Sequence, residues 1–459
     1  MLMGYAMEKV VNPFDSNDFL VLPDNTFIAK MKNPVRLQDV RMQIMKSLEN
    51  PIGTKSLSVI ASEKTRCNPQ AKAVIVVSDN TRPVPYKGEE GILMPIICTL
   101  MSSGFSTSSI TVVIATGTHK AMSEGQIHEM IDEEVFSLGI KVVNHDSKDV
   151  DNLTKIGLTS RGTRVTVNSI YMQADLKILT GLVESHFMAG VSGGRKSVCP
   201  GIIGEESTYV FHGPEFMESD EARNMNLFGN PVHEESLEIA HLAGVDFIVN
   251  VTLDSDFHVT GVFSGDLESA HLAAVEKLKG SVCVKVPYMA DVVITHAGYV
   301  GINHYQCAKC AVAALEIVKE NGSLIILSNT TDRLDPVGNI TYRVCLSLLH
   351  LIGVEKFSSL IKSPDWTFVP DQWEVQQWGK VLKRIPEENL FLYPPLFRKK
   401  DFEIIPGIDA SALIHTCCDA SYQKAIDSSL SIISKREGKA IEDLRIVYLE
   451  DGPYEVPFL

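Results

Sequence analysis

Short apolar runs rich in β-branched residues alternate along this chain with longer segments of helical apolar spacing. The runs at 72–77, 110–115, 176–179, 291–295, 323–328 and 444–449 predict strands, and the segments 91–102, 271–280, 311–320 and 421–436 predict helices. Such alternation is typical of α/β proteins whose sheets are mostly parallel. We therefore expect an α/β fold.

The length of 459 residues favours two domains over one, because single hydrophobic cores stop growing at smaller sizes. A boundary is expected near 278–286, where a helical segment ends in glycine and a new set of strands begins. We predict a first α/β domain over 1–278 plus 412–459 and a second over 279–411. The active-site cleft is expected between them.

The charge of the chain excludes two classes of partner. There are 57 acidic and 42 basic residues, which give a formal net charge of −15. A surface this acidic repels phosphate backbones and anionic lipid, so neither a nucleic acid nor a membrane is expected as a partner. No signal peptide and no apolar run of membrane-spanning length is visible, which predicts a cytoplasmic protein.

The nine cysteines show no disulfide framework and no repeated metal-finger spacing. Cys307 and Cys310 stand alone at helical spacing in an alanine-rich segment. This pattern favours buried packing over half of a zinc site.

Polar motifs follow three of the predicted strands directly. They are SDNTRP at 78–83, TGTHK at 116–120 and TGLVESH at 180–186. In open α/β sheets, ligands bind beyond the carboxyl ends of the strands. These three motifs therefore predict a ligand site at one edge of the first sheet.

A glycine-rich loop at 181–204 is the most informative single segment. Its small residues suggest backbone amides that approach a ligand, and Arg195 and Lys196 add two cations beside them. The glycine spacing fits neither a P-loop nor a dinucleotide-binding fingerprint. The loop indicates anion binding, with a tight turn and two solvated cations as the alternative.

Three histidines lie in or near these polar segments: His119, His186 and His212. A single histidine is usually a structural residue. Three of them near strand-end loops favour proton transfer or metal ligation, for which imidazole is suited near neutral pH.

The motifs together resemble the lactate racemase family. The resemblance is carried by SDNTRP, TGTH, HDSKD at 145–149, HFMAGVSGGRKSVCPG at 186–201 and YQCAK at 305–309, in the family's order and approximate spacing. It runs from about residue 20 to about residue 320. It implies a racemase or epimerase of a 2-hydroxy acid, an isomerase that uses a nickel pincer nucleotide.

The resemblance also implies the residues that hold this cofactor. Lys196 takes the place of the lysine covalently linked to the pyridinium nucleotide, and His212 that of the nickel ligand. Square-planar nickel with soft donors suits hydride chemistry. The other expected cofactor-binding residues are Asp79, Arg82, Thr116, Gly117, Ser192, Gly193, Gly194 and Trp373, with Trp366 and Trp378 as rivals of Trp373.

His119 and His186 match the acid–base pair of the family. In the expected reaction, the C2 hydrogen moves as hydride to the cofactor, which gives a 2-oxo acid, and the hydride then returns to the opposite face. One histidine takes or returns the hydroxyl proton for each substrate enantiomer. Arg82 would grip the substrate carboxylate, and Asp79 would hold a ribose or orient Arg82. Gln306 and Lys309 would line the site from the second domain. The enzymes that make the cofactor are expected partners.

The chain departs from the family pattern in two segments. The resemblance implies that these segments form the wall of the substrate pocket. Ser185 replaces a common proline, Tyr299 and Gly301 stand where a typical member has a proline and an acidic residue, and His304 is an extra polar side chain. We expect the change to suit a longer, hydroxyl-bearing sugar acid better than lactate. Two other functions stay open: an anion- or nucleotide-binding homologue without catalysis, and a zinc hydrolase, although no HExxH spacing is present.

Overall fold

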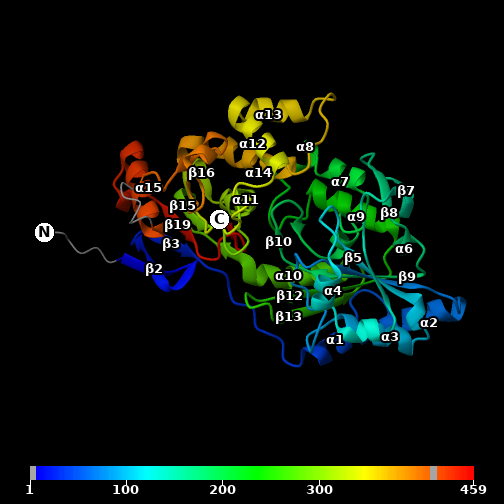
Figure 1. Ribbon diagram of the computed structural model, residues 1–459. Coiled ribbons are helices and arrows are strands. Elements are labelled where there is room, and N and C mark those ends of the chain that lie inside the picture. The colour runs from blue at the N-terminus through cyan, green and yellow to red at the C-terminus, as the bar shows by residue number, and fades with distance from the viewer. Residues whose placement is uncertain (1–6, 414–420) are drawn as a thin grey trace. The chain divides into compact units, whose positions relative to one another are not determined.

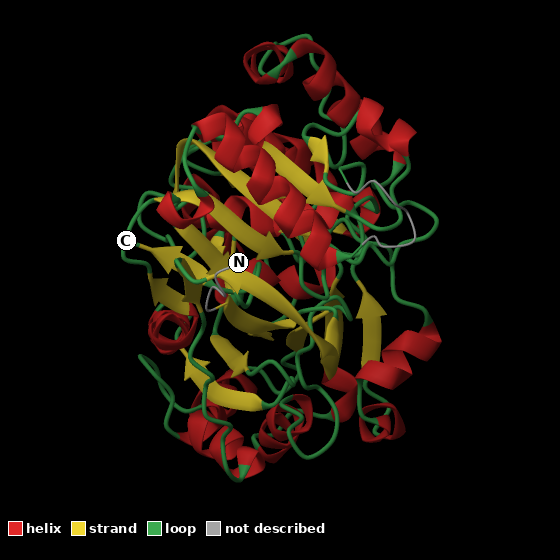
Figure 2. Ribbon diagram, turned by 90° about the vertical axis from the view of Figure 1, so that its left-hand side faces the viewer, coloured by secondary structure: helices red, strands yellow, loops and turns green. Residues whose placement is uncertain are grey.

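The structure is a computed structural model that describes residues 7–413 and 421–459 and divides into two compact units. Unit 1 comprises 1–32, 213–220 and 282–459, and unit 2 comprises 33–212 and 221–281. Each unit contains one six-stranded sheet and its helices, so the predicted α/β class with mostly parallel sheets is confirmed (Figures 1 and 2). Each unit is described here by itself.

The sheet of unit 2 has the order β13-β12-β9-β4-β5-β6. Its strands are β4 (Ala73–Ser78), β5 (Ile110–Ala115), β6 (Lys141–Asn144), β9 (Leu176–Leu182), β12 (Phe247–Leu253) and β13 (Val259–Gly265). All neighbours are parallel except β12 and β13. The chain builds outward from β4 through β5 and β6, then returns to the other side of β4 as β9. The strand order therefore reverses beside β4, where ligands bind in sheets of this kind.

Helices cover both faces of this sheet, with α1, α2 and α3 on one face and α9 on the other (Figure 1). The helices of unit 2 are α1 (Val40–Glu49), α2 (Leu57–Cys67), α3 (Leu93–Ser102), α4 (Glu124–Met130), α5 (Glu133–Ser137), α6 (Ser169–Met172), α7 (Glu205–Phe211), α9 (Pro231–Ala243) and α10 (Ser269–Val282). Two hairpins complete the unit: β7 (Leu153–Leu158) with β8 (Arg164–Asn168), and β10 (Ser185–His186) with β11 (Gly190–Val191). The continuous apolar runs of β4 and β5 fit strands buried on both faces.

The sheet of unit 1 has the order β18-β17-β16-β15-β19-β3 and is parallel throughout. Its strands are β3 (Thr26–Ala29), β15 (Ala290–His296), β16 (Val318–Leu327), β17 (Leu390–Tyr393), β18 (Ile408–Asp409) and β19 (Ile446–Leu449). Smaller pairs are β1 (Met7–Asn12) with β2 (Asp15–Pro23), and β14 (Cys283–Lys285) with β20 (Val456–Phe458).

This sheet corrects the predicted assignment of both ends of the chain. Residues 412–459 were expected to join 1–278, but β19 lies between β15 and β3 in the sheet of unit 1. The N-terminal residues 1–32 belong to the same unit through β3. The apolar alternation of a short strand predicts burial but not which sheet it joins, because pairing between distant strands leaves no local pattern.

The helices of unit 1 are α8 (Pro214–Met217), α11 (His304–Ala314), α12 (Ile340–Ile352), α13 (Val354–Ile361), α14 (Gln372–Arg384) and α15 (Tyr422–Glu437). The helix predicted at 421–436 is confirmed: Ser421 caps it and Gly438, at φ 64°, ends it. The helix predicted at 311–320 is wrong beyond Ala314, because β16 begins at Val318 and pairs with Ala290 of β15. Sheet pairing overrides the helical propensity of the alanine-rich segment there.

Within 7–413 and 421–459, no helix has both the length and the apolar character needed to cross a membrane. The cysteines described in this range are free thiols. Cys307 and Cys310 are buried in α11, where Cys310 donates to the carbonyl of Cys307, which agrees with packing rather than a zinc half-site.

Candidate active site

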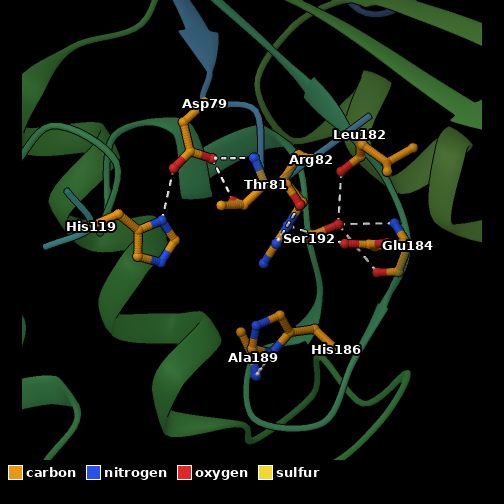
Figure 3. Close-up of polar contacts among 9 residues, drawn as sticks. All are labelled: Asp79, Thr81, Arg82, His119, Leu182, Glu184, His186, Ala189 and Ser192. Atoms are coloured by element: carbon orange, nitrogen blue, oxygen red, sulfur yellow. Dashed lines mark hydrogen bonds and ion pairs between the residues drawn. The ribbon is translucent and has the colours of Figure 1, made fainter. Parts of the chain in front are cut away.

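The three strand-end motifs of unit 2 meet at one edge of its sheet. β9, β4 and β5 are parallel neighbours in that order, so their carboxyl ends point the same way. Asp79 follows β4, His119 lies in the turn after β5, and His186 lies four residues after β9. Figure 3 shows Asp79, Arg82, His119 and His186 around the same part of the site. The sequence prediction of a shared edge is confirmed for these residues.

Asp79 and His119 form a hydrogen-bonded pair. The Nδ1 atom of His119 lies 2.8 Å from Oδ2 of Asp79, while the backbone N–H and the hydroxyl of Thr81 bind the other carboxylate oxygen (Figure 3). Burial alone would raise the pKa of Asp79, but the hydrogen bonds and charges of its partners outweigh burial and lower it. Asp79 is therefore ionised, and it holds His119 rather than orienting Arg82 as its main contact.

Glu184 is the residue that orients Arg82. The Nε atom of Arg82 lies 3.2 Å from Oε1 of Glu184, across the point where the strand order reverses between β4 and β9. Both side chains are partly exposed, so the ion pair leaves the guanidinium accessible to a ligand anion. Glu184 was not predicted from the sequence. The signal that could have indicated it is a carboxylate shortly after a buried strand, in the TGLVESH motif.

The glycine-rich loop is held mainly by its own hydrogen bonds. Ser192 donates from its backbone N–H to the carbonyl of Glu184, and its hydroxyl binds the carbonyl of Leu182 at 2.7 Å. The N–H of Gly194 binds Oδ1 of Asn250, and the N–H of Lys196 binds the carbonyl of Gly193. The expectation that these amides face a phosphate is wrong for these three positions, because each amide already has a protein acceptor.

Two glycines of this loop are required by close packing at positive φ. Gly193 has φ 76° and a Cβ there would come within 2.7 Å of a Val183 methyl group. Gly194 has φ 51° and a Cβ there would lie 3.0 Å from the ring of His271. In the neighbouring turn, Gly117 donates to the carbonyl of Gly201, so these glycines shape the site through their backbones.

Lys196 projects from a 3-10 turn, η3 (Gly194–Ser197), directly after these glycines. Burial lowers the pKa of its amine well below the usual lysine value, and the charges of Arg82 and Arg195 lower it further against the opposing charge of Glu184. The lowered pKa increases the neutral fraction of this amine at a given pH. A neutral amine is a nucleophile, as covalent attachment requires.

His212 lies at the carboxyl end of α7, near Lys196. Its Nδ1–H donates to the carbonyl of Thr208 at 3.0 Å, which fixes the tautomer with the lone pair on Nε2. Burial lowers the pKa of His212 to about 4, and the charge of Lys196 lowers it as well. A neutral imidazole with a fixed tautomer is the form that binds a metal ion.

His145 and Thr116 have structural partners. The hydroxyl of Thr116 donates to the carbonyl of His145 at 2.6 Å, and Nε2 of His145 lies 3.0 Å from the carbonyl of Ile203. Both residues are buried. The HDSKD segment therefore fastens the turn after β5 to the glycine-rich loop.

Arg195 differs from its expected place beside a ligand. Its side chain is only 1% exposed, with Nη2 donating to the carbonyl of Ala189 at 2.8 Å and Nη1 lying 3.3 Å from Nε2 of His271. Burial lowers its pKa to about 9. The alternative of two solvated cations is therefore wrong for Arg195.

Gln306, Lys309 and Trp373 belong to unit 1, on α11 and α14. Trp373 is partly exposed and its Nε1–H donates to the hydroxyl of Tyr305 at 2.8 Å. Of its rivals, Trp378 is fully buried, and the Nε1–H of Trp366 is bound by Gln372. Burial raises the pKa of Glu374, next to Trp373, to about 8 against the charge of Lys309.

The residues expected to form an altered pocket wall have structural roles in unit 1. His304 is 1% exposed, stacks on Trp378 with ring centroids 4.4 Å apart, and binds the hydroxyl of Tyr342. Tyr299 is exposed and stacks on Tyr454. A Cβ at Gly301 would lie 2.2 Å from that of Ala297. The packing of Gly301 and His304 therefore gives no support to the expected gain of room and of a hydrogen-bond donor at these two positions.

This packing predicts the effect of Gly301→Ala. Because the new methyl group has no space against Ala297, we expect the free energy of unfolding to fall by about 1–3 kcal/mol. Gly379→Ala is the matched control, since the nearest atom to a Cβ there is 3.8 Å away inside α14, and it should be neutral or slightly stabilising. Urea unfolding of both variants measures the difference, and equal stability would show that Gly301 is not close-packed.

Comparisons with known proteins agree with this architecture. The model of the lactate racemase N-terminal domain family matches residues 16–224. The lactate racemase of Lactiplantibacillus plantarum is 33% identical over 341 residues, which cover 74% of this chain and 77% of that protein. The lactate racemase of Thermoanaerobacterium thermosaccharolyticum is 32% identical over 367 residues, covering 79% and 82%. The chain belongs to the lactate racemase family.

Solved structures agree with membership of the lactate racemase family. The lactate racemase apoprotein from Thermoanaerobacterium thermosaccharolyticum matches with a TM-score of 0.81 and 26% identity, covering 98% of this chain and 100% of that one. A crystal structure of a Thermotoga maritima protein, at a TM-score of 0.60 and 15% identity, shares the fold. The family and the isomerase class predicted from the motifs are thus confirmed.

The zinc-hydrolase alternative has no support in the described parts of the chain. There, one group of three potential ligands has its ligand atoms within 4.8 Å of one another, and it consists of Asp254, Asp256 and His258. His119, His186 and His212 do not form such a group.

Proposed function

We propose that this protein is a racemase or epimerase that inverts C2 of a 2-hydroxy acid with a nickel pincer nucleotide attached to Lys196. The observation that carries the proposal is a lysine of lowered pKa near a half-buried neutral histidine, His212, in the unit whose sheet edge also holds the Asp79–His119 pair. Two relatives named lactate racemase are 33% and 32% identical to this chain over 74% and 79% of its length.

The residues present fit the proposed cofactor. Lys196 supplies an amine whose lowered pKa favours the neutral form needed for a covalent link, and His212 supplies a neutral imidazole whose Nδ1 is already bound to Thr208. Nickel accepts imidazole nitrogen together with softer donors. When bound, the nickel nucleotide supplies the acceptor for a hydride.

The chain's own residues account for the remaining steps. Arg82, held by Glu184, binds the substrate carboxylate by charge-assisted hydrogen bonds. His119 takes the hydroxyl proton of one substrate enantiomer on Nε2, because Asp79 holds its Nδ1–H, and His186 takes the hydroxyl proton of the other enantiomer. Loss of this proton and of the C2 hydrogen with its electron pair leaves a 2-oxo acid, which receives both back with the hydride on its opposite face.

Gln306, Lys309 and Trp373 complete the proposed set of site residues on the strength of the YQCAK motif and the exposure of Trp373. The cytoplasmic location and the dependence on cofactor-synthesis enzymes stay predictions. A binding homologue without catalysis is the competing function. It gives no reason for the Asp79–His119 pair, which a binding site does not need.

A short substrate fits this site better than the longer sugar acid first expected. The argument for a sugar acid depended on Tyr299, Gly301 and His304, which are used in packing. The relatives are named for lactate. We therefore propose lactate, or another 2-hydroxy acid with a small side chain, as the substrate.

The test is a panel of enantiopure 2-hydroxy acids, from lactate to six-carbon sugar acids, incubated with protein from a host that makes the cofactor. We expect lactate to racemise faster than any sugar acid, as read by chiral chromatography. A preferred six-carbon acid would contradict the substrate, and no turnover of any member by cofactor-loaded protein would contradict the function.

Metal content separates the metal ligand from the proton-moving residue. We expect His212→Ala to lose nickel and activity together, because the variant lacks the imidazole that the tautomer prepares for the metal. His119→Ala should keep nickel and lose turnover. Elemental analysis of both variants measures this, and equal nickel loss in the two would show that the roles are misassigned.

A further inference from the structure

The ladder between β4 and β9 ends before the two strands do. Its last paired residues are Val76 and Leu179, whereas β4 continues to Ser78 and β9 to Leu182. This is the point where the strand order of the sheet reverses and a ligand crevice begins. Buried main-chain groups there need hydrogen bonds from outside the ladder, because such groups are costly to leave unpaired.

Two buried hydroxyl groups, those of Tyr86 and Thr180, supply these hydrogen bonds. The backbone N–H of Ser78 donates to the Tyr86 hydroxyl at 2.7 Å, and the Thr180 hydroxyl donates to the carbonyl of Val76 at 2.8 Å. The two hydroxyl oxygens lie 2.8 Å apart. Because the single hydroxyl proton of Thr180 is used at Val76, Tyr86 is the donor between them. Three hydrogen bonds thus connect the end of β4 to β9.

The bond between Ser78 and Tyr86 closes the loop that follows β4. This loop carries Asp79, which binds His119, and Arg82, which is proposed to bind the substrate carboxylate. Burial and, to a smaller extent, the charge of Asp79 raise the pKa of Tyr86 to about 12. The hydroxyl therefore keeps the proton that it donates, and both ends of the loop are fixed at one buried oxygen atom.

Thr180 also holds the turn that carries Lys196. The hydroxyl of Ser197 donates to the carbonyl of Thr180 at 2.7 Å, and Ser197 directly follows Lys196 in η3. Thr180 is 0% exposed. Its hydroxyl therefore connects to the loop after β4, while its carbonyl connects to the turn of the proposed cofactor lysine.

We propose that Tyr86 is a positioning residue for the reaction, whose hydroxyl fixes the loop of Asp79 and Arg82, through Thr180, in register with the Lys196 turn. This inference rests on the proposed function. Removal of the hydroxyl alone leaves the aromatic ring in place but takes the acceptor from a backbone N–H. Small displacements of groups that position a substrate are costly to the rate.

Tyr86→Phe tests this role by removing one oxygen atom. We expect kcat/KM for lactate to fall by about 10²-fold, because the loop is no longer fixed against β9. Tyr171→Phe is the matched control, since Tyr171 is also buried in unit 2 and its hydroxyl binds the carbonyl of Gly244, in the connection before β12 begins. The control should lose stability and keep wild-type kcat/KM. Equal kcat/KM values for the two variants would overturn the inference.

Thr180→Val and Thr180→Ser test the other end of the connection. Valine has the shape of threonine without the hydroxyl, so Thr180→Val should have the kinetic defect of Tyr86→Phe. Thr180→Ser keeps the hydroxyl and should keep the activity. The losses of Tyr86→Phe and Thr180→Val should not add in the double variant, because both remove one hydrogen bond. If Tyr86→Phe does not fold, the two Thr180 variants still decide, since equal activity of both would overturn the inference.

Nitrogen-15 NMR of the histidine-labelled full chain without cofactor separates this inference from the proposed function. At a pH that keeps the imidazole neutral, His119 should carry its proton on Nδ1, facing Asp79, with signals assigned by their loss in His119→Ala. Tyr86→Phe should give a mixture of tautomers, whereas Tyr171→Phe should give the wild-type signals. An unchanged tautomer in Tyr86→Phe would overturn the inference. If wild-type protein racemises no 2-hydroxy acid, the proposed function fails, and the NMR result still decides whether Tyr86 positions the pair.

Discussion

Lys196→Ala should lose essentially all racemase activity. Lys196 is the amine that the SGGRK segment places near His212, and its lowered pKa favours the neutral, nucleophilic form of a group that alanine lacks. We expect kcat to fall by at least about 10³-fold, since the variant loses the group through which the cofactor is held. Chiral analysis of lactate incubated with equal amounts of each protein measures the fall.

Lys177→Met is the matched control for this variant. Lys177 also has a pKa lowered by burial, but its amine donates to the carbonyl of Ala243, away from the strand-end motifs. This control should keep its turnover with a modest loss of stability. Full activity in Lys196→Ala would show that the amine has no part in the reaction.

The second large effect is expected at the Asp79–His119 pair. His119→Ala should lower kcat by about 10²–10⁴-fold, the range typical of a lost general base. Asp79→Asn should cost nearly as much, because an asparagine amide can donate to Nδ1 and would move the proton of His119 to Nε2. The pair contacts through a 2.8 Å hydrogen bond, so the two losses should not add in the double variant.

His128→Ala provides the control for the histidine pair. His128 is also exposed and its Nδ1 lies 3.1 Å from a carboxylate oxygen of Glu133, but α4 places it outside the strand-end motifs. Its removal should leave kcat unchanged. Additive losses in His119→Ala and Asp79→Asn would show that the two side chains act separately.

The fold class was readable from the sequence because its signals are local. The uninterrupted apolar runs of β4 and β5 predict strands buried on both faces, and the polar residues that follow them mark the strand ends. The position of β19 could not be predicted, since an apolar strand of this length fits either sheet. Its pairing with β15, more than 100 residues away in the sequence, places it in the sheet of unit 1.

The site was readable where a residue type implies its chemistry. Lys196, His212 and His119 were proposed from motifs, and their pKa shifts or hydrogen-bond partners agree with the proposed roles. The supporting contacts were not readable, because Arg195 looked like a solvated cation and Glu184 like a surface acid. Burial and the choice of partner depend on distant segments: Arg195 contacts His271, and Glu184 contacts Arg82.

At the predicted pocket wall, the sequence interpretation gave residues a ligand-binding role for which the structure shows packing contacts instead. Gly301 and His304 were interpreted as room and hydrogen-bonding capacity for a substrate, but each is consumed by contacts within unit 1. A departure from a family motif indicates that something changed locally. Only the packing distances show whether the change faces a ligand or a neighbouring side chain.

Intact mass spectrometry tests the central claim most directly. Protein purified under native conditions from a host that makes the cofactor should be several hundred daltons heavier than the 50.5 kDa chain, and Lys196→Ala prepared in the same way should have the mass of its sequence alone. Fragmentation should place the added mass on Lys196. Actively racemising wild-type protein with no added mass, or the same added mass on Lys196→Ala, would contradict the account.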